Sequence, residues 1–257
     1  MELHIIVCIK SVIANAPDKR VVRSSSSCEL NPYDHPALEV ALRLREQVSG
    51  TITALSMGPY PCAFALNEAM AMGVDRGVLV CDPVLAGSDT LATSNALAAA
   101  IKKLAPFDLV LFGTRAADSD TGQVGPQTAV FLDIPLVTGA HSIELKNDGL
   151  LVERRADGFL DRFELSFPAG LTIHPSANQP RDVGLLGIES AFREGKVKNW
   201  SLAEMGLSAD CVGEAGSPTR LLALSRIKSS RKCNFLMGSA EEQVNELVKR
   251  LSESGVV

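Results

Sequence analysis

Short apolar runs alternate with amphipathic segments over the first 140 residues, and this alternation limits the possible folds more than any other feature of the chain. Continuous apolar runs are typical of strands buried on both faces, and four of them span 3–10, 51–56, 77–81 and 108–113. Apolar residues at helical spacing predict helices over 36–48, 63–72, 89–104 and 126–132. Strands and helices joined by short links form right-handed crossovers, so we predict a doubly wound, Rossmann-like α/β fold with a mostly parallel sheet.

The pattern changes after residue 140. The turn residues Asn147-Asp148-Gly149 lie between two alternating runs and predict a hairpin over 143–153. Further strands are expected over 162–167 and 169–174, with Pro168 between them.

The last third of the chain carries weak core signals. Residues 176–237 show no sustained periodicity, whereas Ser239 and Glu242 form a capping box ahead of a final amphipathic helix. A compact monomer rarely keeps so long an irregular segment on its own surface. We therefore expect an α/β domain over 1–175 and, over 176–257, an arm that wraps a partner subunit. Disorder is the alternative.

Composition excludes several classes of protein. The formal net charge of −5 gives no basic face of the kind that binds nucleic acid. Charged residues interrupt every apolar run before it reaches the length of a membrane span. The first residues lack the basic start and cleavage site of a signal peptide, so we expect a cytoplasmic protein without membrane insertion. The six cysteines form no CxxC pair and are expected to be neither disulfides nor zinc ligands.

A loop and helix start over Asp118–Ala129 form the richest candidate site. Ligands of parallel sheets bind outside the carboxyl ends of the strands, where this loop follows the strand 108–113. We expect Gly122 and Gly125 to let the backbone turn and approach a ligand closely, and Pro126 to occupy the first helical position. The free N–H groups of such a helix start form a phosphate site without any lysine.

Side chains of this loop extend the prediction. Thr121, Gln123 and Thr128 add hydrogen-bond donors, and Asp118 or Asp120 has the chemistry to hold a ribose hydroxyl. Two carboxylates beside a phosphate would repel it, so at least one of them is expected to point away. The alternative is ordinary turn chemistry with no ligand. The chain has neither a GxxxxGK[ST] nor a GxGxxG motif, and no catalytic constellation, so it suggests a binding site rather than a reactive one.

Several motifs together resemble the beta (small) subunit of electron-transfer flavoproteins. They include Asn31-Pro32-Tyr33-Asp34, Ser56-Met57-Gly58-Pro59, the segments 69–77 and 89–93, and above all the stretch from Asp118 to Pro126 followed by Phe131–Pro135. The matching stretches run over most of the chain, and their combination is far more specific than any one of them.

The resemblance implies a heterodimer whose alpha subunit carries a redox-active FAD, while the beta subunit holds a structural AMP. The pair would carry electrons from acyl-CoA-type dehydrogenases to a membrane quinone reductase. Tyr33 matches an aromatic residue near the alpha-subunit flavin, and Leu185 matches the leucine anchor of a partner-docking loop. The implied nucleotide contacts are Cys8, Asn31, Pro32, Tyr33, Asp34, Met57, Asp118, Ser119, Asp120, Thr121, Gly122, Gln123, Val124, Gly125, Pro126, Gln127, Thr128 and Ala129.

Two departures from the family pattern bear on partners. The turn near Ala14 differs from the usual one, and the segment 189–196 is much less basic than the lysine-rich run of many relatives. Electron-bifurcating members bind a second FAD in place of AMP and oxidise NADH there, and the stretch 120–126 resembles theirs as well. Ser119 stands where those proteins usually have glycine, which favours AMP. A stand-alone nucleotide-binding module and an adenylate-transferring enzyme are the remaining alternatives.

Overall fold

A computed structural model describes residues 2–13, 28–193, 197–220, 222–223 and 233–256 of the chain. The turn near Ala14 and the end of the segment 189–196 lie outside these residues. The helices of four or more residues are α1 (His35–Gln47), α2 (Ala63–Met72), α3 (Thr90–Lys103), α4 (Val124–Leu132), α5 (Leu185–Arg193), α6 (Leu202–Met205) and α7 (Ala240–Glu253). The strands are β1 (Glu2–Cys8), β2 (Ser11–Ile13), β3 (Cys28–Leu30), β4 (Ser49–Met57), β5 (Arg76–Val80), β6 (Leu109–Gly113), β7 (Leu136–Leu145), β8 (Gly149–Ala156), β9 (Phe159–Ser166), β10 (Ala169–Ile173) and β11 (Val197–Trp200).

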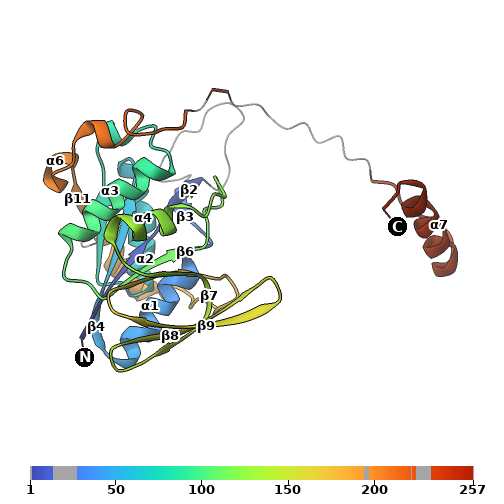
Figure 1. Cartoon of the computed structure of the whole chain (residues 1–257), viewed down its shortest axis with the longest axis horizontal. Coiled ribbons are helices and arrows are strands. Elements are labelled where there is room, and N and C mark those ends of the chain that lie inside the picture. Colours follow the sequence, from blue (N-terminus) through green and yellow to red (C-terminus); the bar gives the residue numbers. More distant parts are fainter. Residues whose placement is uncertain (1, 14–27, 194–196, 221, 224–232, 257) are drawn as a thin grey trace. The chain divides into compact units, whose positions relative to one another are not determined.

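The centre of the fold is a nine-stranded sheet in the order β11-β5-β4-β1-β6-β10-β7-β8-β9, with all pairings from β11 to β7 parallel (Figure 1). Helices α1 and α2 pack into a core on one face of this sheet, which includes Leu38 and Leu66. Helix α3 packs into the core on the other face through Leu97 and Ile101. The predicted doubly wound α/β fold is therefore confirmed.

The predicted boundaries of most elements are also confirmed, because local chemistry sets them. Asp89 caps α3 by accepting a hydrogen bond from the Ala92 amide at 3.0 Å. Helix α2 ends at Gly73, whose φ of 120° few other residues adopt. The hairpin turn at 147–149 joins β7 to β8, and β9 extends the sheet by a further antiparallel pairing.

The segment after residue 175 is more ordered than its pattern predicts. The chain divides into two compact units, 1–220 and 221–257, and the division into a domain and an arm at residue 175 stays a prediction. Helix α5 packs against α2 through an aromatic pair of Phe192 and Phe64, whose ring centroids are 5.4 Å apart, and β11 pairs with β5. The sequence shows little apolar periodicity over α5 and β11 because these elements are short. Whether the C-terminal residues wrap a partner stays a prediction.

The second unit contains the helix α7, which begins at the predicted capping box. The Ser239 hydroxyl accepts a hydrogen bond from the Glu242 amide, and the Glu242 carboxylate accepts one from the Ser239 amide at 2.7 Å. Val244, Leu247 and Val248 are exposed on this helix. No helix among the described residues combines the length and the apolar character needed to cross a membrane.

Candidate nucleotide site

The candidate site lies where the connections after two neighbouring strands leave the sheet toward opposite faces. Strands β1 and β6 pair in parallel register, with Cys8 opposite Phe112. The chain after β1 leads to α1 on one face, whereas the chain after β6 leads to α4, whose Val124 and Leu132 pack with the core of α3 on the other face. Such a divergence opens a crevice at the carboxyl ends of the strands, which is the usual ligand site of open α/β sheets.

The segment Asn31–Asp34 is held at this edge by hydrogen bonds. The Asn31 amide donates to the Lys10 carbonyl at 2.9 Å, and the Lys10 amide donates to Asp34 Oδ2 at 2.7 Å. The Asn31 side chain then joins the loop after β6, donating to the Arg115 carbonyl at 2.9 Å and accepting from the Ala117 amide at 3.1 Å. Asn31 thus ties the start of α1 to the candidate loop.

Asp34 is a buried carboxyl group at the start of α1. Its side chain does not cap the helix, because its oxygens accept hydrogen bonds from the Lys10 amide and from Asn31 Nδ2. Burial raises the pKa of Asp34 to about 7, although these hydrogen bonds and nearby positive charge oppose the shift. Strand β6 passes so close that a Cβ on Gly113 would lie 2.2 Å from Asp34 Oδ1.

The buried Cys8 thiol is another predicted contact at this edge. Burial, followed by the charge of Asp34, raises the pKa of this thiol well above its usual range, so it stays protonated. Met57, half-buried, ends the neighbouring strand β4.

Two cations that the sequence reasoning missed contact the loop after β6. Lys10 Nζ lies 2.7 Å from Asp118 Oδ1 and 3.4 Å from the Ser119 hydroxyl. Arg115 lies over the ring of Tyr33, with Cζ 4.6 Å from the ring centroid, and it donates to the Tyr33 hydroxyl at 2.9 Å. A lysine therefore lies beside the loop that was expected to bind phosphate without one, and the phosphate site itself stays a prediction. The signal was the position of Lys10 directly after β1, at the edge where the parallel strands end.

Both loop carboxylates are paired with cations. Asp118 pairs with Lys10, and Asp120 lies 3.2 Å from Arg115 Nη1. Asp120 adopts a φ of 54° and Gly122 a φ of 63°, so the loop turns through the left-handed region as predicted for Gly122. These ion pairs lower the repulsion that two free carboxylates would exert on an anion.

Helix α4 begins at Val124, two residues earlier than predicted. Pro126 is therefore its third residue rather than its first. The missing N–H of proline still falls within the first turn, whose N–H groups have no intrahelical acceptors. Gln123 precedes the helix, and its side-chain carbonyl accepts a hydrogen bond from Thr90 at 3.1 Å.

Four predicted contacts face the protein interior. A Cβ on Gly125 would lie 3.0 Å from Thr172 Cγ2, so this glycine serves the packing of α4 and does not form a turn. Thr128 is not a free donor, because its hydroxyl donates to the Val124 carbonyl at 2.7 Å. Gln127 accepts from Ser94 of α3 at 3.2 Å, and Ala129 is buried. Pro32, Ser119 and Thr121 are exposed at the site edge.

The arrangement offers hydrogen-bond donors and positive charge to an anion. It combines the Lys10 ammonium group, the free amides at the start of α4 and a left-handed turn at Gly122. An adenine nucleotide fits this chemistry, because its phosphate needs donors and its ribose hydroxyls need acceptors such as Asp118 or Asp120. Among the described residues, no group of three or more His, Cys, Asp or Glu side chains is placed to hold a metal ion.

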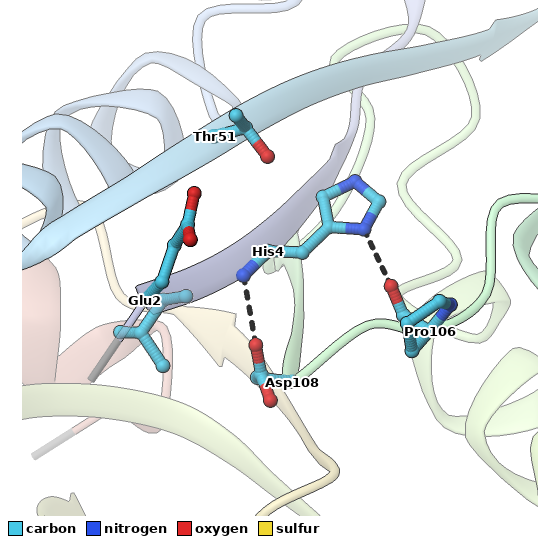
Figure 2. A pocket seen from close by; sticks show the side chains of 6 residues that line it. Glu2, His4, Thr51, Pro106 and Asp108 are labelled. Carbon is cyan, nitrogen blue, oxygen red and sulfur yellow. Dashed lines mark hydrogen bonds between the residues drawn. The ribbon is translucent and has the colours of Figure 1, made fainter.

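A shallow pocket at the opposite edge of the sheet is a separate feature (Figure 2). It has a volume of about 280 Å³ and is lined by Glu2, Leu3, His4, Thr51, Pro106 and Asp108. His4 Nδ1 lies 2.7 Å from the Pro106 carbonyl, and its Nε2 lies 3.0 Å from the Thr53 hydroxyl. Both ring nitrogens therefore have structural partners, and this pocket lies at the amino ends of the strands, away from the candidate site.

The predicted docking leucine is at the start of α5. Leu185 is 86% exposed and its neighbour Leu186 is 82% exposed. Helix α5 is anchored on its other side, where Ala191 is buried and Phe192 meets Phe64 of α2. Exposed leucines on an anchored helix are typical of an interaction surface.

Comparisons with known proteins agree with the resemblance seen in the sequence. The family described as "Electron transfer flavoprotein domain" matches residues 19–205. The chain is 38% identical to electron transfer flavoprotein subunit beta of Thermoanaerobacterium thermosaccharolyticum, over 99% of this chain and 100% of the relative. It is 35% identical to acryloyl-CoA reductase electron transfer subunit gamma of Anaerotignum propionicum, over 99% and 100% of the two chains. It is 33% identical to caffeyl-CoA reductase-Etf complex subunit CarD of Acetobacterium woodii, again over 99% and 100%.

Proposed function

This chain belongs to the electron transfer flavoprotein family as a beta subunit, and from this premise we propose that it binds an adenine nucleotide at the Lys10–Asp118 edge. The family gives the chain a role in electron transfer. The observation that carries the nucleotide proposal is the set of hydrogen bonds from Lys10 and Asn31 to the loop 114–123, which leads into α4. A positive side chain and a helix start at one strand edge form an anion site.

The nucleotide in this proposal is AMP, and its role is structural. It would rest against the same loop that Asn31 ties to α1, so bound nucleotide would stiffen the connection between β1 and β6. An FAD held mainly by an alpha subunit would then carry the electrons. Tyr33, held under Arg115, is the aromatic side chain that we propose lies toward that flavin.

The electron-transfer partner in this proposal is a flavoprotein that acts on CoA esters, either a dehydrogenase or a reductase. Two relatives that align over 99% of this chain are named as subunits of CoA-ester reductase systems. The exposed pair Leu185 and Leu186 supplies an apolar anchor for such a partner. Delivery of electrons onward to a membrane quinone reductase stays a prediction.

A second candidate is a bifurcating subunit that binds FAD in place of AMP and oxidises NADH. The names of the reductase-associated relatives favour it, because reduction of a CoA ester requires a supply of electrons. Ser119 is exposed, and its hydroxyl lies next to the Lys10 ammonium group. The side chain at this position therefore does not fill the protein core.

One measurement separates the two candidates. The purified alpha–beta complex is denatured, and its released nucleotides are quantified by mass spectrometry. We expect one AMP and one FAD per heterodimer. Two FAD and no AMP would replace the first candidate with the second, and a complex that releases no nucleotide from this chain would contradict both.

A further inference from the structure

The residues before α5 are fastened to α1 along its length. We define residues 177–193 as the docking segment, since they lead into and include the helix that carries Leu185. Asn178 Nδ2 donates to the Pro36 carbonyl at 3.0 Å, near the start of α1. Arg43 Nη2 donates to the Gln179 carbonyl at 3.2 Å, about two helical turns farther along. The first residues of the docking segment therefore lie on the surface of α1.

Arg181 makes the most extensive of these contacts. Its Nε and Nη2 donate to the two carboxylate oxygens of Glu39 at 2.8 and 3.2 Å, in a bidentate pair. Its backbone amide also donates to Glu39 Oε2 at 3.1 Å, and its Nη1 donates to Glu46 Oε1 at 2.8 Å. One arginine thus bonds with side chain and backbone to two carboxylates on α1.

Glu39 is an unusual partner because its side chain is only 4% exposed. Burial would raise the pKa of this carboxyl, but hydrogen bonds from Arg181 and Arg43 outweigh that effect and hold the pKa below its ordinary value. A buried carboxylate that keeps its charge holds its donors in a narrow geometry. Surface ion pairs such as Arg250 with Glu246 lack this constraint.

A second contact fixes the helix itself. A Cβ on Gly187 would lie 2.3 Å from the Ala71 carbonyl oxygen, so the first turn of α5 touches the backbone of α2. The exposed leucines 185 and 186 therefore lie between two anchors, Arg181 before the helix and Gly187 within it.

We propose that Arg181, through its bidentate pair with Glu39, is a positioning residue that presents Leu185 and Leu186 to the partner flavoprotein. This inference rests on the docking role proposed above. Without the pair, the residues between 178 and 186 would have to become ordered each time the partner flavoprotein binds. The conformational entropy lost in that step would weaken binding. Arg181 touches no part of the nucleotide site and acts only through the docking segment.

The test uses the full alpha–beta complex with a purified acyl-CoA dehydrogenase, reduced by its acyl-CoA, as electron donor. Electron transfer is measured against donor concentration for Arg181→Met, Arg181→Lys and the wild type. We expect Arg181→Met to raise the KM for the donor about tenfold with kcat unchanged, and Arg181→Lys to recover part of the loss. Amide hydrogen exchange over 178–190 should accelerate in Arg181→Met, while nucleotide content stays the same.

Arg45→Met is the matched control, because Arg45 lies on α1, the helix that carries Glu39, and pairs with Asp75 rather than with the docking segment. Arg43 still pairs with Glu39 in Arg181→Met, and the double variant Glu39→Gln/Arg181→Met keeps the test valid if the single variant folds poorly. An unchanged KM in Arg181→Met, when Leu185→Ala raises it, would overturn this inference alone. An unchanged KM in Leu185→Ala would overturn the docking proposal, and the inference with it.

Discussion

The ammonium group of Lys10 lies 2.7 Å from the carboxylate of Asp118, so a residue that follows the first strand contacts a loop more than 100 positions later. This ion pair joins the chain that follows β1 to the loop that follows β6, at the carboxyl ends of the two strands. Both side chains are only about one-third exposed, at 38% and 33%, so the pair is partly shielded from solvent.

Lys10→Gln is predicted to weaken nucleotide binding. The substitution removes the positive charge beside Asp118 while keeping a hydrogen-bond donor, so a phosphate loses a charge-assisted contact. We expect the Kd for AMP, measured by calorimetry on the nucleotide-stripped complex, to rise by about tenfold or more. Lys198→Gln, at an exposed position on β11, is the control and should leave the Kd unchanged. Equal Kd values in the two variants would remove Lys10 from the site.

Asp34 is predicted to make stability depend on pH. Its pKa is raised to about 7 from an ordinary 3.8, so the folded state binds this proton more tightly than the unfolded state does. Its contribution to stability is therefore full below about pH 4 and is lost as the pH rises to about 7. In Asp34→Asn, the decline in the free energy of unfolding between pH 5 and pH 8 should be smaller than in the wild type, by on the order of 2 kcal/mol. Parallel curves for both proteins would show that Asp34 is ionised in the fold.

Gly125→Val is predicted to expel the nucleotide and to weaken assembly with the alpha subunit. A Cβ at this position would meet Thr172 Cγ2 at 3.0 Å and Phe112 Cγ at 3.2 Å, so the start of α4 must move away from the sheet. Gly184→Val adds the same atoms where no atom lies within 4 Å of the new Cβ, and it should retain the nucleotide. Full nucleotide occupancy in Gly125→Val would show that the phosphate does not depend on the position of α4.

Leu185→Ala is predicted to weaken docking without weakening the fold. The side chain is 86% exposed, so its truncation removes little buried surface and should shift the Tm by less than about 1 °C. The KM for the donor flavoprotein should rise about tenfold if this leucine enters a pocket of the partner. Leu160→Ala, an exposed leucine on the edge strand β9, serves as the control and should change neither quantity.

Most elements of the first 140 residues were predictable because they carry their own signals, whereas the three-residue strands β2 and β3 were not predicted. Asp89 and Gly73 mark the ends of helices through local capping chemistry, and the apolar runs mark strands buried on both faces. Elements α5 and β11 were not predicted, because nine and four residues carry too little periodicity. Their positions depend on contacts with α2 and β5, which belong to distant parts of the chain.

The candidate site shows the same division. The loop from Asp118 was predicted from its residue types and its position after a strand, whereas Asn31 and Asp34 were predicted from the family resemblance. The sequence analysis did not predict contacts by Lys10 and Arg115. It also gave Gly125 and Thr128 the wrong physical role. The role of each of these residues depends on which group of another element lies next to it.

The sequence by itself determined the doubly wound α/β fold and the order of most elements in its first 140 residues, and it predicted the loop most suited to an anion. These features follow from periodicity and turn chemistry, which act over a few residues. Only the tertiary structure decided that Lys10 faces Asp118, that Arg181 holds Glu39 and that the start of α4 packs on Thr172. The residues of these pairs are 47 to 142 positions apart in the sequence. They meet only when the parallel sheet has formed and helices cover both of its faces.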